Sequence, residues 1–317
     1  MMKRERALLL LASWASKKIT LVLFGQTKNE KLKKFGRARN EQIVVPKNNF
    51  HFSCIMKPMK QNNRNTSWQP VATWYNKITG EGGHYYHQHV VIPGVLRLLG
   101  LGSKPNIQNT KYNILDVACG NGVLAKSLPQ NVEYTGIDIA PSLIEEAKRS
   151  DKNRDHKYIV ADATKSLNLT EKFTHAAIVL ALQNISYPEG VLENVSKLLI
   201  VNSKLVIVLN HPAFRIPRQS SWGIDDNTKM QYRRIDKYMS PMDIPITAHP
   251  GERFSPNTLS YHFPISAYSK MLKDAGFAIE LIEEWTSDKE SIGRNSKMEN
   301  RARNEFPLFM TIVAKKL

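Results

Sequence analysis

The stretch Ile114-Leu115-Asp116-Val117-Ala118-Cys119-Gly120-Asn121-Gly122-Val123-Leu124-Ala125 decides the fold of this chain. Residues 113–117 form a short apolar run of the kind that makes a buried parallel strand. Gly120 and Gly122 let the backbone turn with a ligand lying against it, and residues 123–128 return to helical spacing. Because a turn that opens a helix leaves N–H groups unpaired, the pattern predicts a site for a carboxylate or phosphate.

Asp116 indicates which ligand this turn binds. The spacing of Gly120, Gly122 and Ala125 also fits the loose dinucleotide fingerprint. A pyrophosphate gains nothing from a nearby carboxylate, whereas a ligand with an ammonium and a sulfonium does. The segment Asp116 to Gly122 resembles the first motif of class I S-adenosylmethionine (SAM) methyltransferases, and its Asp-x-x-Cys-Gly-x-Gly form is common in the type 11 group. The resemblance implies that SAM is the cofactor and contacts Asp116, Ala118, Gly120, Asn121 and Gly122.

Composition predicts a globular protein without a membrane span. The chain has 317 residues, of which 42% are hydrophobic, enough for a sizeable core. No apolar run approaches the roughly 20 residues that cross a bilayer. The two cysteines, Cys54 and Cys119, form no disulfide framework, so we expect a reducing, cytoplasmic compartment.

The positive charge is concentrated in residues 1–66. This leader holds 15 of the 45 Lys and Arg residues but only three of the 28 Asp and Glu residues, while the net charge of the whole chain is +17. A run of this kind is usually solvated or disordered. A signal sequence and a transit peptide each fit only in part, and we favour a translation start at Met56 or Met59.

Two helices should precede the first strand, over residues 68–79 and 85–99, separated by a glycine-rich turn. The second begins with the cluster His84-Tyr85-Tyr86-His87-Gln88-His89. The rings could pack at the helix start, or bind a metal, for which a fourth ligand is missing from the pattern. By the resemblance, a helix before the core closes the cofactor pocket, which makes Tyr86 and His87 candidates for a lid.

From residue 112 onward strands and helices alternate, which predicts a mostly parallel sheet covered on both faces. Asp138 ends the second strand (132–138), where a carboxylate can accept both ribose hydroxyls or cap the next helix. After the third strand (156–161), the resemblance places Asp162 against the adenine amine and the N–H of Ala163 at a ring nitrogen, although a turn or cap also suits Asp162. Ile139 and Leu180 complete the expected cofactor contacts.

The fourth strand (173–182) ends in Leu182-Gln183-Asn184-Ile185, which should face the transferred methyl group. It lacks the Asn-Pro-Pro-Tyr motif of enzymes that methylate exocyclic amines of nucleic-acid bases. The fifth strand (203–209) precedes a long irregular insertion, residues 211–262, that we expect to cap the substrate or to form a satellite core. Its candidates are Phe214, Trp222, Tyr232 and Tyr261 for substrate contact, and His211 and His262 for a general base.

The last third supplies a helix (264–275), a sixth strand (277–283) and a seventh (309–314), with Glu283–Trp285 and Glu299–Arg303 expected on the loop between these strands. The predicted fold is therefore α/β, a Rossmann-like mostly parallel seven-stranded sheet with an N-terminal helical lid, formed by residues 67–317. The predicted function is methyl transfer from SAM to a small molecule. Two alternatives stay open, an RNA methyltransferase that uses the basic leader and a non-catalytic SAM-binding module; the oligomeric state is not predicted.

Overall fold

The computed structural model describes residues 68–80, 83–101, 112–247, 255 and 257–317. The basic leader, residues 1–66, lies outside the described residues, so the expectations about it concern no part of the structure below.

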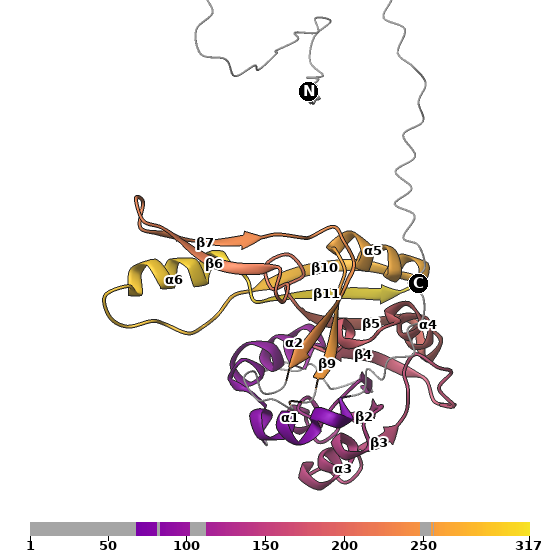
Figure 1. Cartoon of the computed structure of the whole chain (residues 1–317). Helices are drawn as coiled ribbons and strands as arrows, with labels where there is room; N and C mark the ends of the chain where they lie inside the picture. Colours follow the sequence, from indigo (N-terminus) through magenta and orange to yellow (C-terminus); the bar gives the residue numbers. More distant parts are fainter. Residues whose placement is uncertain (1–67, 81–82, 102–111, 248–254, 256) are drawn as a thin grey trace, which may run out of the picture. The chain divides into compact units, whose positions relative to one another are not determined.

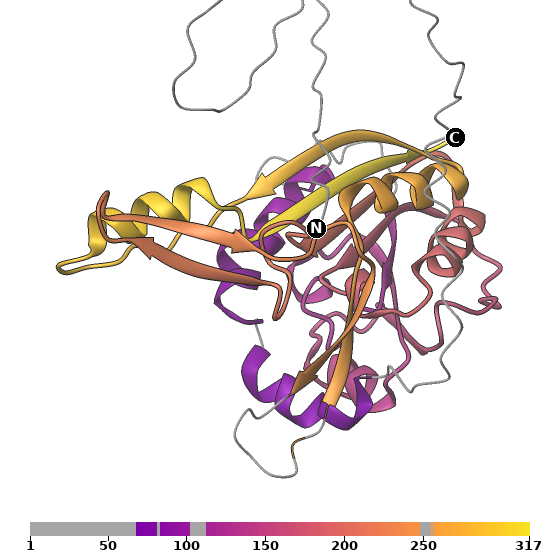
Figure 2. The same ribbon diagram turned by 45° about the horizontal axis from the view of Figure 1, so that its top comes forward.

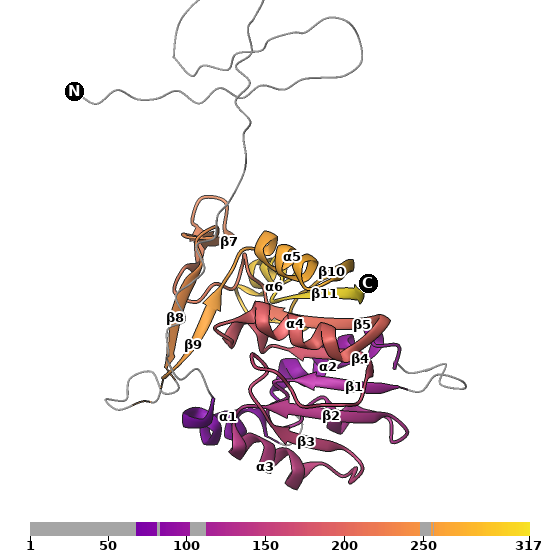
Figure 3. The same cartoon turned by 90° about the vertical axis from the view of Figure 1, so that its right-hand side faces the viewer.

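A seven-stranded sheet organises the described residues, with strand order β10-β11-β5-β4-β1-β2-β3 (Figures 1 and 3). β11 is antiparallel to both of its neighbours, and the other pairs are parallel. The fold class predicted from the sequence, a Rossmann-like mostly parallel seven-stranded sheet, is thus confirmed. The strands are β1 (Asn113–Val117), β2 (Glu133–Asp138), β3 (Lys157–Val160), β4 (Phe173–Val179), β5 (Leu199–Asn210), β10 (Phe277–Trp285) and β11 (Phe309–Lys316).

Helices bury both faces of this sheet. Alternate residues of β5 point to opposite faces, and Val206 and Val208 pack in one core cluster with α2 (Ile92–Leu98) and α3 (Pro141–Ser150). Leu205 and Ile207 are buried on the opposite face. On that side α4 (Pro188–Leu198) packs against α5 (Ile265–Asp274), as Figure 3 shows. Because every central strand is covered twice, its sequence is almost continuously apolar.

The segment after β1 differs from the prediction. The expected helix over residues 123–128 is only a 3₁₀ turn, η3 (Ala125–Ser127), preceded by consecutive turns. Leu128 is extended, as expected for a residue that precedes a proline. The helix N-terminus that was expected to attract an anion is therefore missing, and ligand contacts must come from the turn itself.

Helical segments precede the sheet, as expected, in shorter pieces. The first comprises η1 (Gln69–Val71) and α1 (Ala72–Thr79), and the second begins with a π-helical turn, η2 (His87–Val91), that runs into α2. Single π turns inside helices are frequent at functional sites.

The insertion after β5 is not irregular, contrary to the prediction. It contains two antiparallel hairpins, β6 (Ser220–Asp225) with β7 (Met230–Ile235), and β8 (Met242–Thr247) with β9 (Asn257–His262). The first hairpin lies beside α6 (Ser296–Glu305), as Figures 1 and 2 show. Strands of both hairpins lie beyond the same end of the parallel strands (Figure 3). Both strands of this hairpin are partly exposed, so they lack the buried apolar alternation by which strands are recognised.

The prediction of a loop between the last two strands was also wrong. Glu283–Trp285 belong to β10, and Glu299–Arg303 lie in α6. The side chain of Glu283 forms a salt bridge with Arg97 on the protein surface.

Candidate functional site

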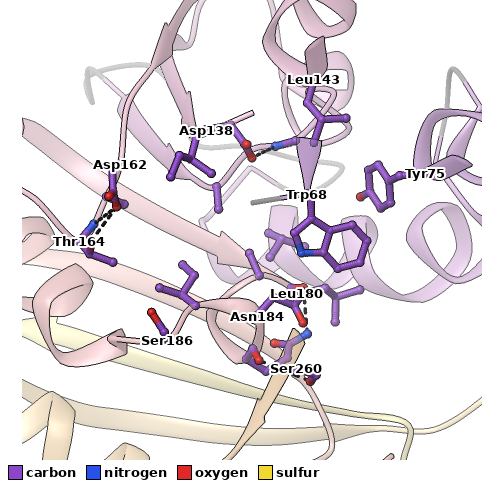
Figure 4. Close-up of a pocket in the computed structure, with 18 of the residues that line it drawn as sticks. Trp68, Tyr75, Asp138, Leu143, Asp162, Thr164, Leu180, Asn184, Ser186 and Ser260 are labelled. Carbon is purple, nitrogen blue, oxygen red and sulfur yellow. Dashed lines mark hydrogen bonds between the residues drawn. The ribbon is translucent and has the colours of Figure 1, made fainter. Parts of the chain in front are cut away.

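A cavity of about 680 Å³ opens at the carboxyl edge of the parallel strands. Ligand sites in open α/β sheets lie at this edge, where the strand order reverses, and here the order reverses between β1 and β4. Figure 4 shows the cavity. Its lining comes from three parts of the chain: the ends of the strands (Ala118, Gly120, Asp138, Ile139, Asp162, Ala163, Leu180 and Asn210 among them), the N-terminal segments (Trp68, Tyr75 and His87), and the insertion (Pro217, Ile246 and Ser260).

The glycine turn contributes two residues to the cavity. Ala118 and Gly120 both line it and both have left-handed backbone, with φ of 56° and 55°. A Cβ on Gly120 would meet only Tyr75, at 3.6 Å. Gly122 differs, because it lies in the core, where a Cβ would come within 2.9 Å of the Tyr158 hydroxyl. Only the first glycine of the motif therefore faces the cavity.

Asp138 is a buried carboxylate at the end of β2. Its Oδ2 accepts the N–H of Gly120 at 2.9 Å and its Oδ1 accepts the N–H of Ala140 at 2.8 Å, so it joins two turns. Burial raises the pKa of Asp138, and these N–H bonds oppose the increase. The N-cap of α3 is Ala140, which makes no side-chain capping bond. Asp138 lines the cavity and keeps lone pairs for a further donor.

Asp116, in contrast, lies beneath the turn. It is 2% exposed, does not line the cavity, and its Oδ2 accepts the hydroxyl of Tyr134 at 2.8 Å. Burial raises the pKa of Asp116 to about 7. The Tyr134 ring crosses Gly136, where a Cβ would lie 2.7 Å from the tyrosine hydroxyl and 2.8 Å from Cys119 Sγ. Burial also raises the pKa of the Cys119 thiol, which packs in this core.

Asn121 joins the glycine turn to α1. It is 1% exposed, and its amide donates to Thr79 Oγ1 at 2.9 Å and to Asn76 Oδ1 at 3.2 Å. This contact places Tyr75 over the turn, and Trp68 packs edge-on against Tyr75 with 5.4 Å between ring centroids. Both rings line the cavity, although neither was selected from the sequence. In the sequence, these two residues are marked only as aromatic positions in the helix predicted over residues 68–79.

Asp162 follows β3 and has one oxygen occupied by its own turn. Its Oδ1 accepts the N–H and the hydroxyl of Thr164, at 3.0 and 2.7 Å, and Oδ2 lies 3.2 Å from Lys165 Nζ. Burial alone would raise the pKa of Asp162, but the bonds from Thr164 and Lys165 hold it below the usual value. Asp162 is therefore ionised at neutral pH and lines the cavity beside Ala163.

The turn after β4 is strained at Leu180. This residue has a left-handed φ of 54°, and its carbonyl accepts the side-chain amides of Gln183 and Asn184 at 2.8 and 3.2 Å. Leu180, Gln183 and Asn184 all line the cavity. The amide bonds hold a backbone conformation that costs an ordinary residue about 1–2 kcal/mol.

His87 lines the cavity, and Tyr86 points elsewhere. Burial and the neighbouring His84 lower the pKa of His87 to about 4, so the ring is neutral at physiological pH. Its Nδ1 accepts the N–H of His84 at 3.2 Å, which puts the ring proton on Nε2. Tyr86 instead contacts Ser287 and Phe309. In the described part of the chain, no group of three or more His, Cys, Asp or Glu side chains is placed to hold a metal ion.

The two histidines considered as bases lie outside the cavity lining. His211 is 1% exposed, its Nε2–H donates to Glu284 at 2.6 Å, and its Nδ1 accepts the N–H groups of Ala213 and Phe214. Burial lowers the pKa of His211, although Glu284 opposes this effect. His262 is also buried and donates to the carbonyl of Tyr238 at 2.7 Å. The ring nitrogens of His211 and His262 thus form hydrogen bonds that hold the insertion in place.

The four aromatic residues considered for substrate contact do not line the cavity either. Phe214 and Trp222 pack against Phe306. Tyr232 lies on the partly exposed hairpin and Tyr261 is 4% exposed. The insertion reaches the cavity through Pro217, Ile246 and Ser260, which the sequence analysis missed because small and aliphatic residues carry no chemical signal.

Comparison with known families decides the class of this site. Residues 115–207, from the glycine turn through β5, match a family described as "Methyltransferase domain", the type 11 group. The chain carries a SAM-dependent methyltransferase domain. Its cofactor is SAM, as the motif predicted.

Solved structures share the fold of this methyltransferase. A putative SAM-dependent methyltransferase from Listeria monocytogenes is 21% identical, with a TM-score of 0.53 over 66% of this chain and 92% of that one. One from Mesorhizobium loti is also 21% identical, with a TM-score of 0.53 over 71% and 96%. A putative methyltransferase in complex with the Trm112 activator of Haloferax volcanii is 12% identical, with a TM-score of 0.51 over 78% and 95%. The search of curated proteins finds no match.

No helix in the described ranges is both long and apolar enough to span a membrane.

Proposed function

We propose that this methyltransferase binds SAM in the cavity at the carboxyl edge of the sheet and transfers its methyl group to a small molecule. The observation that carries the proposal is the cavity itself, because one continuous space joins the cofactor motifs to the insertion. Its volume of about 680 Å³ lies in the range of small-molecule sites, roughly 300–1,000 Å³.

The residues of the cavity fit SAM. In this proposal Asp138 accepts the ribose hydroxyls, and Asp162, ionised at neutral pH, accepts the adenine amine, with the N–H of Ala163 at the ring. Ile139 is 44% exposed in the cavity, an arrangement that suits an apolar base ring. Ala118 and Gly120 allow the methionine part to approach the backbone, with Tyr75 and the Nε2–H of His87 above it. Asp116, Asn121 and Gly122 support the turn from below.

When bound, SAM supplies a methyl group on a sulfonium, which needs no further activation. The protein therefore aligns the acceptor and excludes water, effects that can lower a barrier by roughly 7–11 kcal/mol. Leu180 and its two amide partners shape the floor of the transfer site, and Asn184, Ser186, Asn210 and Ser260 supply neutral polar groups near the acceptor. Since His211 and His262 lie outside this lining, we propose an acceptor whose nucleophile is already deprotonated at neutral pH.

We propose one catalytic domain over residues 67–317 with the insertion at 211–262 as its cap, located in the cytoplasm. An RNA substrate is the second candidate, but it depends on the basic leader and should show binding that weakens steeply with salt.

Ligand-dependent melting tests the proposal. A ligand specific to the native state, present at 100 times its Kd, stabilises the fold by about 2.7 kcal/mol. SAM should raise the melting temperature, and NAD should leave it unchanged. A response to NAD alone would refute the cofactor assignment. If SAM raises the melting temperature, screening small-molecule extract with labelled SAM identifies the acceptor.

A further inference from the structure

Two side-chain amides line the cavity at the 3₁₀ turn that follows β4, η4 (Leu182–Asn184). The NH₂ groups of Gln183 and Asn184 both donate to the carbonyl of Leu180, at 2.8 and 3.2 Å, and Figure 4 shows Asn184 beside Leu180. Because a carbonyl can only accept, these two bonds fix which end of each amide is nitrogen and which is oxygen. The Leu180 carbonyl therefore leaves both amide oxygens available for other donors.

These two oxygens have no donor among the described residues. Gln183 is 6% exposed, and its Oε1 is shielded from solvent without a hydrogen-bond partner. No group in the described part of the chain donates to Asn184 Oδ1. The neighbouring Ser260 hydroxyl donates instead to the backbone carbonyl of Gln183, at 3.4 Å. Since a buried acceptor without a donor is unfavourable, the turn favours a molecule in the cavity that brings N–H or O–H groups.

The charge of the lining argues against an anionic acceptor. Among the described residues that line the cavity, Lys165 is the only lysine or arginine, and its Nζ lies 3.2 Å from Asp162. A carboxylate, phosphate or thiolate would therefore lose its water without gaining a free cation. The unpaired oxygens of Gln183 and Asn184 would also repel it. The nucleophile that suits this lining is uncharged.

The lining argues equally against a hydroxyl, which needs a base. Burial and His84 lower the pKa of His87 to about 4, and its Nδ1 already accepts the N–H of His84. Burial and the charge of Asp138 raise the pKa of Tyr75, so its phenol keeps its proton. Asp138 and Asp162 belong to the proposed cofactor site. An uncharged amine needs no base, because its lone pair is available at neutral pH.

We propose that the acceptor is an uncharged amine, and that Gln183 Oε1 and Asn184 Oδ1 accept N–H groups of the nitrogen that receives the methyl group. The inference rests on the proposed function, since it names the chemical class of the acceptor at the same site. An aromatic amine fits best, because conjugation with the ring keeps its nitrogen unprotonated at neutral pH. The rings of Trp68 and Tyr75, which line the same cavity, supply apolar surface for such a ring.

The two amides would act on the nitrogen as it reacts. The nitrogen lone pair forms the new C–N bond to the methyl carbon while the C–S bond breaks, and the electron pair of the broken bond stays on sulfur. The nitrogen then carries a positive charge until one of its N–H protons passes to water. Hydrogen bonds from N–H to the amide oxygens strengthen as this charge develops, so Gln183 and Asn184 stabilise the transition state.

Binding of three matched probes to the protein saturated with S-adenosylhomocysteine tests the inference. Aniline, phenol and benzoate present an amine, a hydroxyl and a carboxylate on the same ring, and calorimetric titration gives their Kd values. Gln183→Met and Asn184→Leu replace each amide by an apolar side chain of similar size. Asn227→Leu is the matched control, because Asn227 is exposed in the turn between β6 and β7 and does not line the cavity.

Aniline should bind wild type and Asn227→Leu alike, and more tightly than phenol or benzoate. Gln183→Met and Asn184→Leu should each bind aniline about fivefold more weakly, the loss expected for one neutral hydrogen bond. Methylation of aniline with labelled SAM should slow by about tenfold or more, because the bond to the charged nitrogen is stronger. Gln183→Met should keep its melting temperature, since it removes an unpaired buried acceptor together with one bond to Leu180.

Three results would overturn the inference: tighter binding of phenol or benzoate than of aniline, no binding of aniline to wild type, or wild-type aniline affinity in both variants. A purely structural amide would lower the melting temperature and leave the aniline Kd unchanged. If one variant does not fold, the other decides under the same criteria.

The cofactor measurement separates the two proposals. If wild type does not bind S-adenosylhomocysteine, the proposed function fails. If wild type binds S-adenosylhomocysteine and aniline binding does not depend on Gln183 or Asn184, only the inference about the acceptor fails.

Discussion

The carboxyl edge of the sheet and the insertion after β5 line the same cavity by different physical means. At the sheet edge, buried carboxylates and left-handed turns follow directly from strands that are held on both faces, as at Asp138 and Leu180. The insertion consists of two hairpins. The first, β6–β7, is partly exposed and packs on α6, and β9 of the second packs against η1 and η4. The first region is therefore suited to a fixed ligand, and the second can vary with the acceptor without disturbing the sheet.

Loss of the Asp138 carboxylate should produce the largest effect. This effect should be limited to SAM binding at the carboxyl edge of the sheet. Hydrogen bonds to a charged group contribute about 1.5–3 kcal/mol each, so Asp138→Ala should weaken SAM binding at least tenfold. Calorimetric titration of SAM measures this, with Arg234→Gln as a variant of the insertion that keeps wild-type affinity. Unchanged SAM affinity with a lower melting temperature would make Asp138 a purely structural residue that joins the turns at Gly120 and Ala140.

The two regions should respond to pH with opposite signs. Folding raises the pKa of Asp116 from 3.8 to about 7, so the folded state holds a proton that the unfolded chain releases between these values. This contribution to stability is complete below pH 3.8 and decreases by up to about 4 kcal/mol as pH rises to 7. In the insertion, burial lowers the pKa of His262 from 6.5, so its contribution is present above pH 6.5 and is lost as pH falls.

Asp116→Asn should accordingly flatten the decline between pH 4 and 7, and His262→Gln should flatten the loss on the acid side. Denaturant unfolding at several pH values measures both slopes. If the Asp116 variant keeps the wild-type slope, the buried carboxylate is not responsible for it.

The smallest effect should come from the exposed hairpin. Trp222 is 39% exposed and contacts Phe306 and Arg233, so Trp222→Ala should cost about 1–2 kcal/mol from one aromatic pair and one cation–π contact. SAM affinity should not change, and Tyr232→Ala, 48% exposed, should cost less. Chemical denaturation together with SAM titration checks both variants. A loss of 3–5 kcal/mol would instead indicate a buried satellite core.

The part of the fold predicted from the sequence is the part in which the signal is local. Strand β1, the turn at Gly120 and Asp138 at the end of β2 lie within 26 residues, and buried parallel strands produce continuous apolar runs. The same local pattern placed Asp162 and Leu180 at the ends of β3 and β4.

Other features depend on contacts that sequence spacing does not encode. The partner of His211 is Glu284, 73 positions away, and no local pattern predicts that this bond occupies the imidazole. Tyr75 reaches the glycine turn because Asn121 binds α1, 42 residues from Thr79. The first hairpin and α6 were missed because they pack on each other with exposed outer faces, which removes the apolar periodicity that identifies such elements.

The Tyr134 side chain packs over Gly136, and this packing restricts which residue relatives can carry at that position. Gly136 lies within β2, where its backbone is not left-handed, yet a side chain there would collide with the tyrosine that bonds Asp116. In an alignment of relatives that keep this tyrosine and aspartate, the column for Gly136 should be invariant. Because Gly136 lies two positions before Asp138, such invariance would suggest contact with the ligand. Its cause would instead be the buried Tyr134–Asp116 hydrogen bond, which lies outside the cavity lining.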